Sequence, residues 1–157
     1  MIEVHKNIFV GSEIGCFHDQ KEDWIVIHAC KNPCHCHAVG YGGNLPNTHS
    51  EYFISEKENH LYLNMVDMKR PFSPTHTHPM MKKDLNLIYS SINDKKILVH
   101  CNMGQSRSAS IVLLYLAREN KISKDSFNEV FKNFLDIYPN YNPGEGIKSY
   151  LNFNWRN

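Results

Sequence analysis

A cysteine and an arginine stand six residues apart, between a segment expected to be a strand and a segment expected to be a helix. Cys101 comes just after the apolar run 97–99, and Arg107 directly precedes the helix-forming stretch 108–118. A loop of this length can wrap around one anion, with its backbone N–H groups and the positive end of the helix facing the anion. These surroundings favour the nucleophilic thiolate, and a planar guanidinium can bind two oxygens of one phosphate. The pattern therefore predicts attack by Cys101 on a phosphate ester.

The residues between and beside these two each have a candidate part. Gly104 permits a turn that would strain other residues. Ser108 can donate its hydroxyl to the cysteine sulfur and help it leave when a phospho-cysteine is hydrolysed. We expect six consecutive residues to bind the phosphate: Asn102, Met103, Gly104, Gln105, Ser106 and Arg107. The alternative is a structural cysteine beside a surface arginine, which would not require the glycine, the serine and both flanking elements together.

Asp67 is the candidate general acid. It follows the apolar run 61–66, so we expect it at the carboxyl end of a strand, beside the Cys101 loop. A leaving oxygen needs a proton as the P–O bond breaks, and the same carboxylate can later take one from the attacking water. Asp84 is the rival, but the helix expected after Pro79 would carry it as a helix-start charge on its polar, solvent-facing side. We therefore assign this role to Asp67.

The rest of the pattern indicates the elements that position these residues. Short apolar runs predict buried strands, and apolar residues at three-to-four-residue steps predict helices. Strands are expected at 8–10, 24–29, 61–66 and 97–99; helices at 81–92, at 108–118, after a cap at Ser123, and from Pro143, capped by Asn142, to about Phe153. This alternation predicts an α/β fold with a central, mainly parallel sheet flanked by helices. The segment 30–50 has neither period and is expected to be an irregular surface excursion.

Length and composition limit the classes of protein that need to be considered. A chain of 157 residues suits a single domain over 1–157. A net charge of +1 without a Lys/Arg run predicts no nucleic-acid or anionic-membrane partner, and no signal peptide or spanning segment is expected. Five cysteines, an odd number, with one needed as a thiolate, argue against a disulfide scaffold and favour a reducing cytoplasm. The oligomeric state stays open.

The segment HCNMGQSRS, residues 100–108, resembles the signature of the dual-specificity branch of the protein tyrosine phosphatase superfamily. That signature is His-Cys, five residues, Arg, then Ser or Thr. The resemblance extends from IFVG at Ile8 to PNYNPGEGIKSYL, ending at Leu151, and LNMVD fits the family's acid on a loop some thirty residues before the cysteine. It implies a tyrosine-phosphatase-like fold and metal-free, two-step hydrolysis of phosphotyrosine, with phosphoserine and phosphothreonine as further candidate substrates. The segments 30–50 and 71–79 depart from the family pattern.

Cysteine and histidine gather in residues 30–37. In the lipid-phosphatase branch of the superfamily, a cysteine at a similar strand end protects the nucleophile through a disulfide, so Cys30 is a candidate redox partner; an inert buried cysteine is the alternative. A zinc site is chemically conceivable from Cys30, Cys34, His35, Cys36 and His37, with His28 and His49 nearby. The spacing lacks a paired C-x-x-C and the resembled family needs no metal. We therefore expect neither a metal nor another cofactor.

Three alternative functions follow from the same residues. A pseudophosphatase that only binds phosphorylated partners would usually have lost Cys101, Arg107 or the acid, and all three are present. A phosphoinositide phosphatase is expected to carry Lys in the loop, whereas NMGQS is uncharged. An RNA 5′-phosphatase would need a basic surface, which the charge balance does not indicate. We therefore expect a phosphorylated protein or peptide as the substrate.

Overall fold

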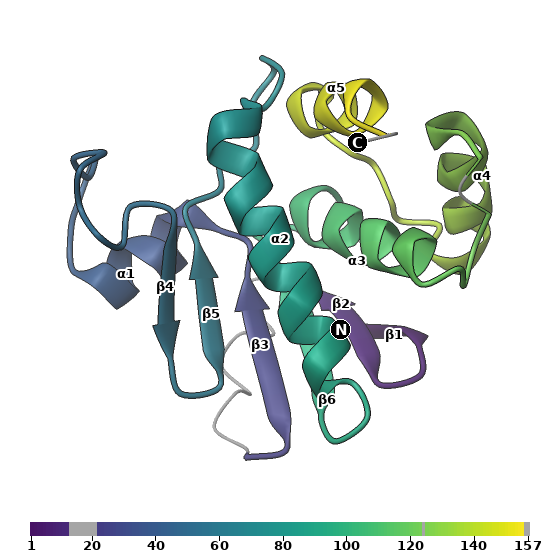
Figure 1. Cartoon of the computed structure of the whole chain (residues 1–157), viewed down its shortest axis with the longest axis horizontal. Coiled ribbons are helices and arrows are strands. Elements are labelled where there is room, and N and C mark those ends of the chain that lie inside the picture. Colours follow the sequence, from purple (N-terminus) through teal and green to yellow (C-terminus); the bar gives the residue numbers. More distant parts are fainter. Residues whose placement is uncertain (13–21, 124, 156–157) are drawn as a thin grey trace.

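The computed structural model of the protein describes residues 1–12, 22–123 and 125–155, and it contains one mixed sheet (Figure 1). The strands are β1 (Ile2–His5), β2 (Ile8–Gly11), β3 (Trp24–His28), β4 (Ile54–Lys57), β5 (His60–Leu63) and β6 (Lys96–His100), in the spatial order β1-β2-β6-β3-β5-β4. The four inner strands are parallel to one another, while β1 and β4 run antiparallel at the edges. The predicted mainly parallel sheet is confirmed.

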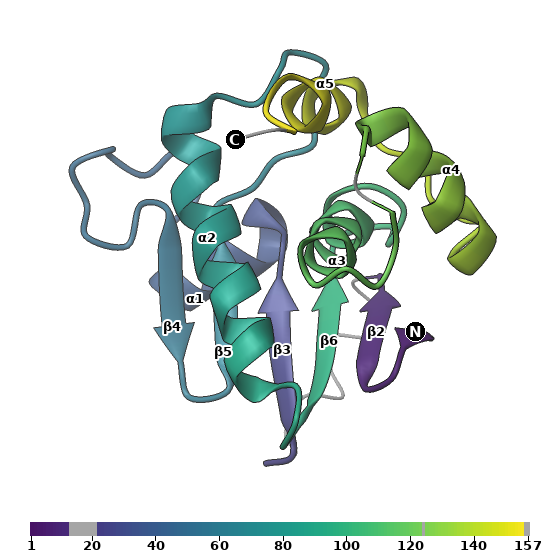
Figure 2. The same ribbon diagram turned by 45° about the vertical axis from the view of Figure 1, so that its right-hand side comes forward.

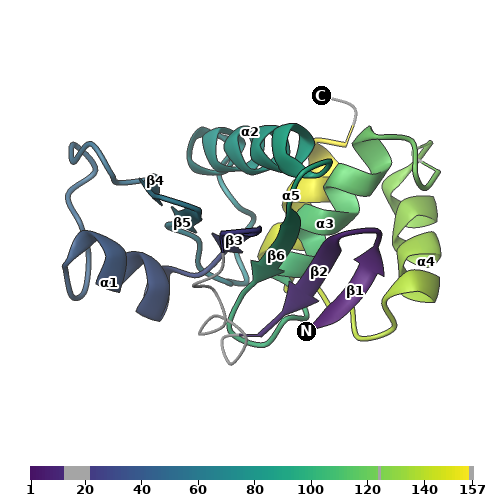
Figure 3. The same ribbon diagram turned by 90° about the horizontal axis from the view of Figure 1, so that it is seen from below.

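Helices lie on both sides of this sheet. They are η2 (Lys31–His35), a wider helical turn, followed by α1 (Cys36–Val39), α2 (Pro74–Ser91), α3 (Arg107–Arg118), α4 (Phe127–Ile137) and α5 (Glu145–Phe153). Seen from below, α2 and α3 cover one face, and α1 lies on the opposite side near β4 and β5 (Figure 3). The α/β fold expected from the alternation of strands and helices is therefore present.

The two faces of the sheet differ in chemistry because side chains alternate along each strand. Ile27, Leu61 and Val99 are fully buried in the main hydrophobic core. That core includes most of α3, which is buried nearly all round, as its apolar sequence predicts. The neighbouring positions His28 and His100 point to the opposite face, toward η2. Both imidazoles are buried there.

The four parallel strands all end at the same edge of the sheet (Figure 2). The Cys101 loop follows β6, the η2 turn follows β3, and the segment 64–73 follows β5. These three connections therefore meet at the carboxyl ends of the parallel strands, which is where parallel α/β sheets bind their ligands.

The structure corrects the expected limits of several elements. Strands β1 and β4 were not predicted, and the expected strand 61–66 ends at Leu63. The expectation for 30–50 is wrong at its start, where η2 and α1 form and Gly40 ends α1 with a left-handed φ of 93°. Helix α2 begins at Pro74 and contains Pro79, which the sequence placed ahead of the helix. One proline costs this 18-residue helix a hydrogen bond without ending it.

The caps of the last two helices also differ from expectation. Ser126, not Ser123, caps α4, and its hydroxyl accepts a hydrogen bond from the Glu129 amide at 3.2 Å. Helix α5 begins at Glu145 after Gly144, so Asn142 and Pro143 precede it. The backbone amides of Asn142 and Gly144 donate to the Cys101 loop.

Candidate active site

The loop after β6 holds Cys101 at its start. The thiol is 2% exposed, and its sulfur lies 3.2 Å from the Ser108 hydroxyl, within reach of a hydrogen bond. Gly104 has a φ of +74°, and a Cβ there would lie 3.0 Å from the backbone of Gly11. Only glycine satisfies both the left-handed conformation and this close approach to β2. The loop is thus tightly curved and pressed against the sheet.

The start of α3 is open to a ligand. Ser106 occupies the cap position of this helix but makes no side-chain cap; its hydroxyl instead accepts a hydrogen bond from the Gly144 amide at 2.9 Å. The first amides of a helix have no partner within it. Together with the positive end of the helix dipole, they are suited to bind an anion. The Met103 side chain is 72% exposed, so its predicted phosphate contact can come only from its backbone.

Arg107 is held in place beneath this loop, and its side chain is 7% exposed. One terminal nitrogen donates to the Met65 carbonyl at 2.9 Å, and the other donates to Asn102 Oδ1 at 2.6 Å. The buried Nε has no hydrogen-bond partner among the described residues. A buried donor without an acceptor is unusual in a native protein. A bound oxyanion would supply the missing acceptor.

A later segment of the chain holds the loop from outside. The Tyr138 hydroxyl donates to the Gly104 carbonyl at 2.7 Å, and the Asn142 amide donates to the Gln105 carbonyl at 2.9 Å. Burial, with Cys101 nearby, raises the pKa of Tyr138, so its hydroxyl remains a donor at neutral pH. Sequence reasoning missed the contact of Asn142 because residues 142–145 were interpreted only as a helix start, and it assigned Tyr138 no role.

Asp67 and Arg107 line the same cavity, about 610 Å³ in volume, which meets the loop at Asn102 and Arg107. The Asp67 side chain is exposed and lies against Gly144, where an added Cβ would collide with its carboxylate. Gly144 in turn bonds to the loop through Ser106. The candidate acid and the candidate phosphate clamp are therefore brought together.

Asp84 occupies a different environment from the one expected. Its side chain is fully buried in α2 rather than turned toward solvent, so that expectation is wrong. Its carboxylate oxygens have no hydrogen-bond partner in the part of the chain that the structure describes. Burial raises the pKa of Asp84 well above its ordinary value. The backbone amide of Leu85 is close enough to lower this pKa in part, but it does not reach hydrogen-bond geometry with the carboxylate.

Cys30 lies beside the loop. Its thiol is buried and donates to the Asn32 carbonyl at 2.9 Å and to Asn102 Oδ1 at 3.3 Å. Asn102 thus joins Cys30 to the guanidinium of Arg107.

The other cysteines and histidines of 30–37 do not share one centre. The His35 ring bonds to the Tyr41 hydroxyl at 2.6 Å and to the Glu51 carbonyl at 2.9 Å, while His37 is exposed. Burial lowers the pKa of His35, which keeps the ring neutral as a partner in these bonds. Cys34 turns away from them toward His100, with its sulfur 3.9 Å from Nε2.

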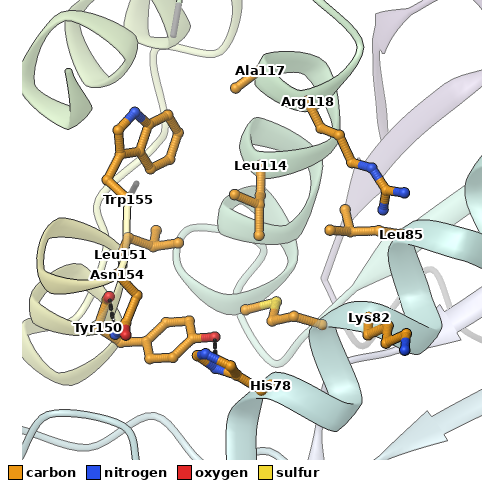
Figure 4. Close-up of a pocket in the computed structure, with 11 residues that line it drawn as sticks. His78, Lys82, Leu85, Leu114, Ala117, Arg118, Tyr150, Leu151, Asn154 and Trp155 are labelled. Atoms are coloured by element: carbon orange, nitrogen blue, oxygen red, sulfur yellow. Dashed lines mark hydrogen bonds between the residues drawn. The ribbon is translucent and has the colours of Figure 1, made fainter. Parts of the chain in front are cut away.

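A second cavity, of about 470 Å³, lies between α2, α3 and α5 (Figure 4). Its wall is largely apolar, with Leu114 and Trp155 among the lining residues, and the Tyr150 hydroxyl lies 2.7 Å from His78 Nδ1 on one side. It shares no lining residue with the cavity beside Arg107. The chemistry of Cys101 is therefore separate from this space.

A strand, a cysteine loop, a buried arginine and a helix in this order define the class of cysteine-dependent phosphatase folds. More specifically, the chain belongs to the family of the dual specificity phosphatase catalytic domain, whose family model matches residues 27–151. The resemblance inferred from the residues around Cys101 is confirmed.

Individual relatives agree with this assignment. Protein 123R of Invertebrate iridescent virus 6, which carries the name of a tyrosine phosphatase, is 36% identical over 99 residues, covering 62% of this chain and 64% of that protein. The tyrosine-protein phosphatase MSG5 of Saccharomyces cerevisiae is 40% identical over 72 residues, or 42% of this chain and 14% of that protein. The crystal structure of DUSP15 has the same fold, with a TM-score of 0.65 at 20% identity over 99% of this chain and 87% of that one. The chain thus spans less than two thirds of the length of protein 123R and of MSG5.

Among the helices in the described ranges, none has the length and apolarity required to cross a bilayer.

Proposed function

We propose that this protein is a cysteine-dependent phosphatase that hydrolyses phosphotyrosine, and also phosphoserine and phosphothreonine, in proteins or peptides. It would act as a single catalytic domain over residues 1–157, in a reducing cytoplasm, without a metal or cofactor in the reaction. The observation that carries the proposal is the buried Arg107, whose Nε lacks an acceptor among the described residues, beneath a cysteine loop at the start of α3. Membership of the dual specificity phosphatase family supports it.

The reaction divides into two steps. In the first, the Cys101 thiolate attacks phosphorus, an S–P bond forms, the P–O bond to the substrate breaks, and Asp67 gives its proton to the leaving oxygen. In the second, water attacks the phospho-cysteine, Asp67 takes the water's proton, and the sulfur leaves as a thiolate. The Ser108 hydroxyl, 3.2 Å from the sulfur, stabilises that leaving thiolate. Arg107 binds the equatorial oxygens, where charge is held in both transition states.

A substrate panel tests this function. The purified protein should hydrolyse p-nitrophenyl phosphate and phosphotyrosine peptides, with lower rates on phosphoserine and phosphothreonine peptides. The same preparation should release little phosphate from phosphoinositides or from RNA 5′ ends. The reason is that residues 102–106 carry no lysine or arginine and the net charge of +1 indicates no basic surface. Tight binding of phosphopeptides without turnover would instead identify a pseudophosphatase, and preferred hydrolysis of a lipid or an RNA would overturn the proposed substrate class.

Replacement of the candidate acid Asp67 should lower kcat most for substrates whose leaving group must be protonated. Asp67→Asn is expected to lower kcat on phosphotyrosine peptides by about 10²-fold, and far less on aryl phosphates whose leaving group needs little protonation. Steady-state kinetics across a series of aryl phosphates measures this dependence. Asp84→Asn is the matched control, since Asp84 is buried in α2. If Asp84→Asn loses the activity and Asp67→Asn keeps it, the assignment is wrong.

Two neighbouring glycines offer a test of where Asp67 must lie. A Cβ at Gly144 would displace only the flexible Asp67 carboxylate, whereas a Cβ at Gly146 would strike the backbone carbonyls of Met68 and Arg70. We expect Gly144→Ala to keep its stability but lose about tenfold in kcat on peptides, part of the contribution of a general acid. Gly146→Ala should lose about 1–3 kcal/mol of stability in thermal or urea unfolding. Equal kcat for Gly144→Ala and the parent would show that the observed position of Asp67 is not the active one.

Oxidation tests the proposed role of Cys30. Hydrogen peroxide oxidises a cysteine thiolate to a sulfenic acid; attack by a second thiol then releases water and forms a disulfide. We expect peroxide to inactivate the protein reversibly, peptide mapping to find a Cys30–Cys101 disulfide, and dithiothreitol to restore activity. Cys30→Ser should lose activity irreversibly, while Cys36→Ser should behave as the parent does. If Cys30→Ser recovers as fully as the parent, Cys30 has no part in protection.

A further inference from the structure

Three buried side chains with metal-ligating atoms converge behind the Cys101 loop. His28, Cys34 and His100 each place one ligand atom within 4.8 Å of the other two. His100 Nε2 lies 2.6 Å from His28 Nδ1 and 3.9 Å from the Cys34 sulfur. None of the three is more than 6% exposed. Two imidazoles and a thiol thus share one small, buried volume.

The fold positions this cluster through the sheet register. His28 of β3 pairs directly with His100 of β6, so both rings stand on the same face. The η2 turn begins three residues after His28 and crosses that face, which brings Cys34 over the two rings. This is the face opposite the hydrophobic core. The cluster therefore belongs to a part of the molecule that the proposed reaction does not use.

The surroundings of His28 hold its ring in the orientation of a ligand. Its other nitrogen, Nε2, lies 2.9 Å from His60 Nδ1, and the Tyr62 ring stacks on it at 4.3 Å with an interplanar angle of 12°. Metal-binding histidines commonly donate their second ring N–H to an acceptor, usually a carboxylate, a carbonyl or water, and His60 Nδ1 stands in that position here.

We propose that His28 Nδ1, His100 Nε2 and the Cys34 thiolate form a binding site for one zinc-type divalent ion, with His60 as the outer partner of His28. Imidazole nitrogen and thiolate sulfur are the preferred ligands of zinc. Around a tetrahedral ion with ordinary bond lengths, two ligand nitrogens lie about 3.4 Å apart, and a nitrogen and a sulfur lie about 3.6 Å apart. The two separations given above differ from these values by less than about 1 Å, and all three ligand atoms lie within 4.8 Å of one another. Movements of about 1 Å in the rings and in the Cys34 side chain therefore bring them to one ion. Binding converts the Cys34 thiol to a thiolate and releases its proton, while the proton between His28 Nδ1 and His100 Nε2 moves to the other nitrogen of the ring that carries it.

This site differs from the zinc set considered from the sequence. Of the five residues in 30–37, only Cys34 takes part, and its partners come from β3 and β6. The ion would fasten η2 to the sheet next to Cys101, because His100 directly precedes that residue. Three protein ligands leave the fourth tetrahedral position to a water molecule. The ion has no part in the reaction proposed for Cys101. The inference is therefore independent of the proposed reaction.

Cobalt(II) titration tests the site, since Co²⁺ takes zinc's place and reports its ligands in the visible and near-ultraviolet spectrum. The protein should carry Cys101→Ser, so that the nucleophile cannot contribute a thiolate. We expect one equivalent of Co²⁺ to give tetrahedral d–d bands and a thiolate-to-cobalt charge-transfer band, and one equivalent of Zn²⁺ to remove both. Absence of stoichiometric binding, or a spectrum without the charge-transfer band, would overturn the proposal.

Matched variants assign the ligands. Cys34→Ser should remove the charge-transfer band and weaken zinc affinity, measured by competition with a chromophoric chelator, at least tenfold. Cys36 is buried to a similar degree and begins α1, directly after the η2 turn that carries Cys34. The zinc affinity of Cys36→Ser should therefore stay within twofold of the parent's. His60→Gln, at a half-buried position, should weaken binding about tenfold, as loss of an outer partner does. Circular dichroism checks that each variant is folded. If Cys34→Ser and Cys36→Ser bind equally, the site is not the one proposed.

Discussion

Cys101→Ser is expected to abolish turnover while the fold and the phosphate-binding loop persist. A serine hydroxyl is far less ionised than a thiol, so attack on phosphorus should slow by about 10⁴-fold or more, as for other removed nucleophiles. The loop amides, the start of α3 and Arg107 do not depend on the sulfur. The variant should therefore still bind phosphopeptides, as isothermal titration measures, with a melting temperature close to that of the parent.

Variants of Arg107 should differ from Cys101→Ser in that they lose phosphopeptide binding. Arg107→Ala should lose binding as well as turnover, and Arg107→Lys should recover little, because an ammonium cannot reproduce the planar fork that contacts Met65 and Asn102. Measurable hydrolysis by pure Cys101→Ser would contradict the covalent mechanism. Near-parental activity of Arg107→Lys would show that the fork is unimportant.

Removal of the buried charge at Asp84 should stabilise the protein. Because the folded state holds the Asp84 proton to higher pH than the unfolded chain, whose ordinary pKa is 3.8, stability is fully present below that value and falls as pH rises through the folded pKa. Asp84→Asn should therefore exceed the parent in free energy of unfolding at pH 8, by a margin that shrinks toward pH 4. Asp84→Leu also removes the unpaired polar group and should add about 1–3 kcal/mol.

Urea unfolding at several pH values measures these differences. Asp136→Asn, at an exposed position on α4, is the control and should follow the parent across the whole range. A parent-minus-variant difference that does not change with pH would show that folding does not shift the pKa of Asp84. A less stable Asp84→Leu at pH 8 would mean that the carboxylate has a stabilising partner.

The parts of the fold that could be predicted are those with strong local patterns. The apolar runs of β3 and β6 and the apolar α3 are visible in short windows of sequence, and the Cys101 loop lies between two of them. Edge strands β1 and β4 escaped prediction because each is four residues long and carries charged, exposed positions. Such strands are defined by pairing with a neighbour more than by their own composition.

The remaining parts depend on distant contacts. Asp84 occupies a helical position that composition assigned to solvent, and only the packing of α2 reveals its burial. The contact of Tyr138 with Gly104 joins residues 34 apart, and the pairing of His28 with His100 joins residues 72 apart. No short-range pattern specifies either contact. The sequence could therefore suggest Cys101, Arg107 and Asp67, but not the groups that hold them or the cluster behind them.

The contacts from residues 138–144 to the phosphate loop have a consequence for the order of events on the ribosome. Gly144 is made 43 residues after Cys101, so at ordinary rates of translation about 2 to 9 s separate the two. During that interval β6 and the nucleophile exist without the bonds that shape the loop around them. A nascent chain arrested before Tyr138 should therefore present Cys101 as an ordinary thiol, and a phosphate pocket should form only after synthesis has passed the start of α5.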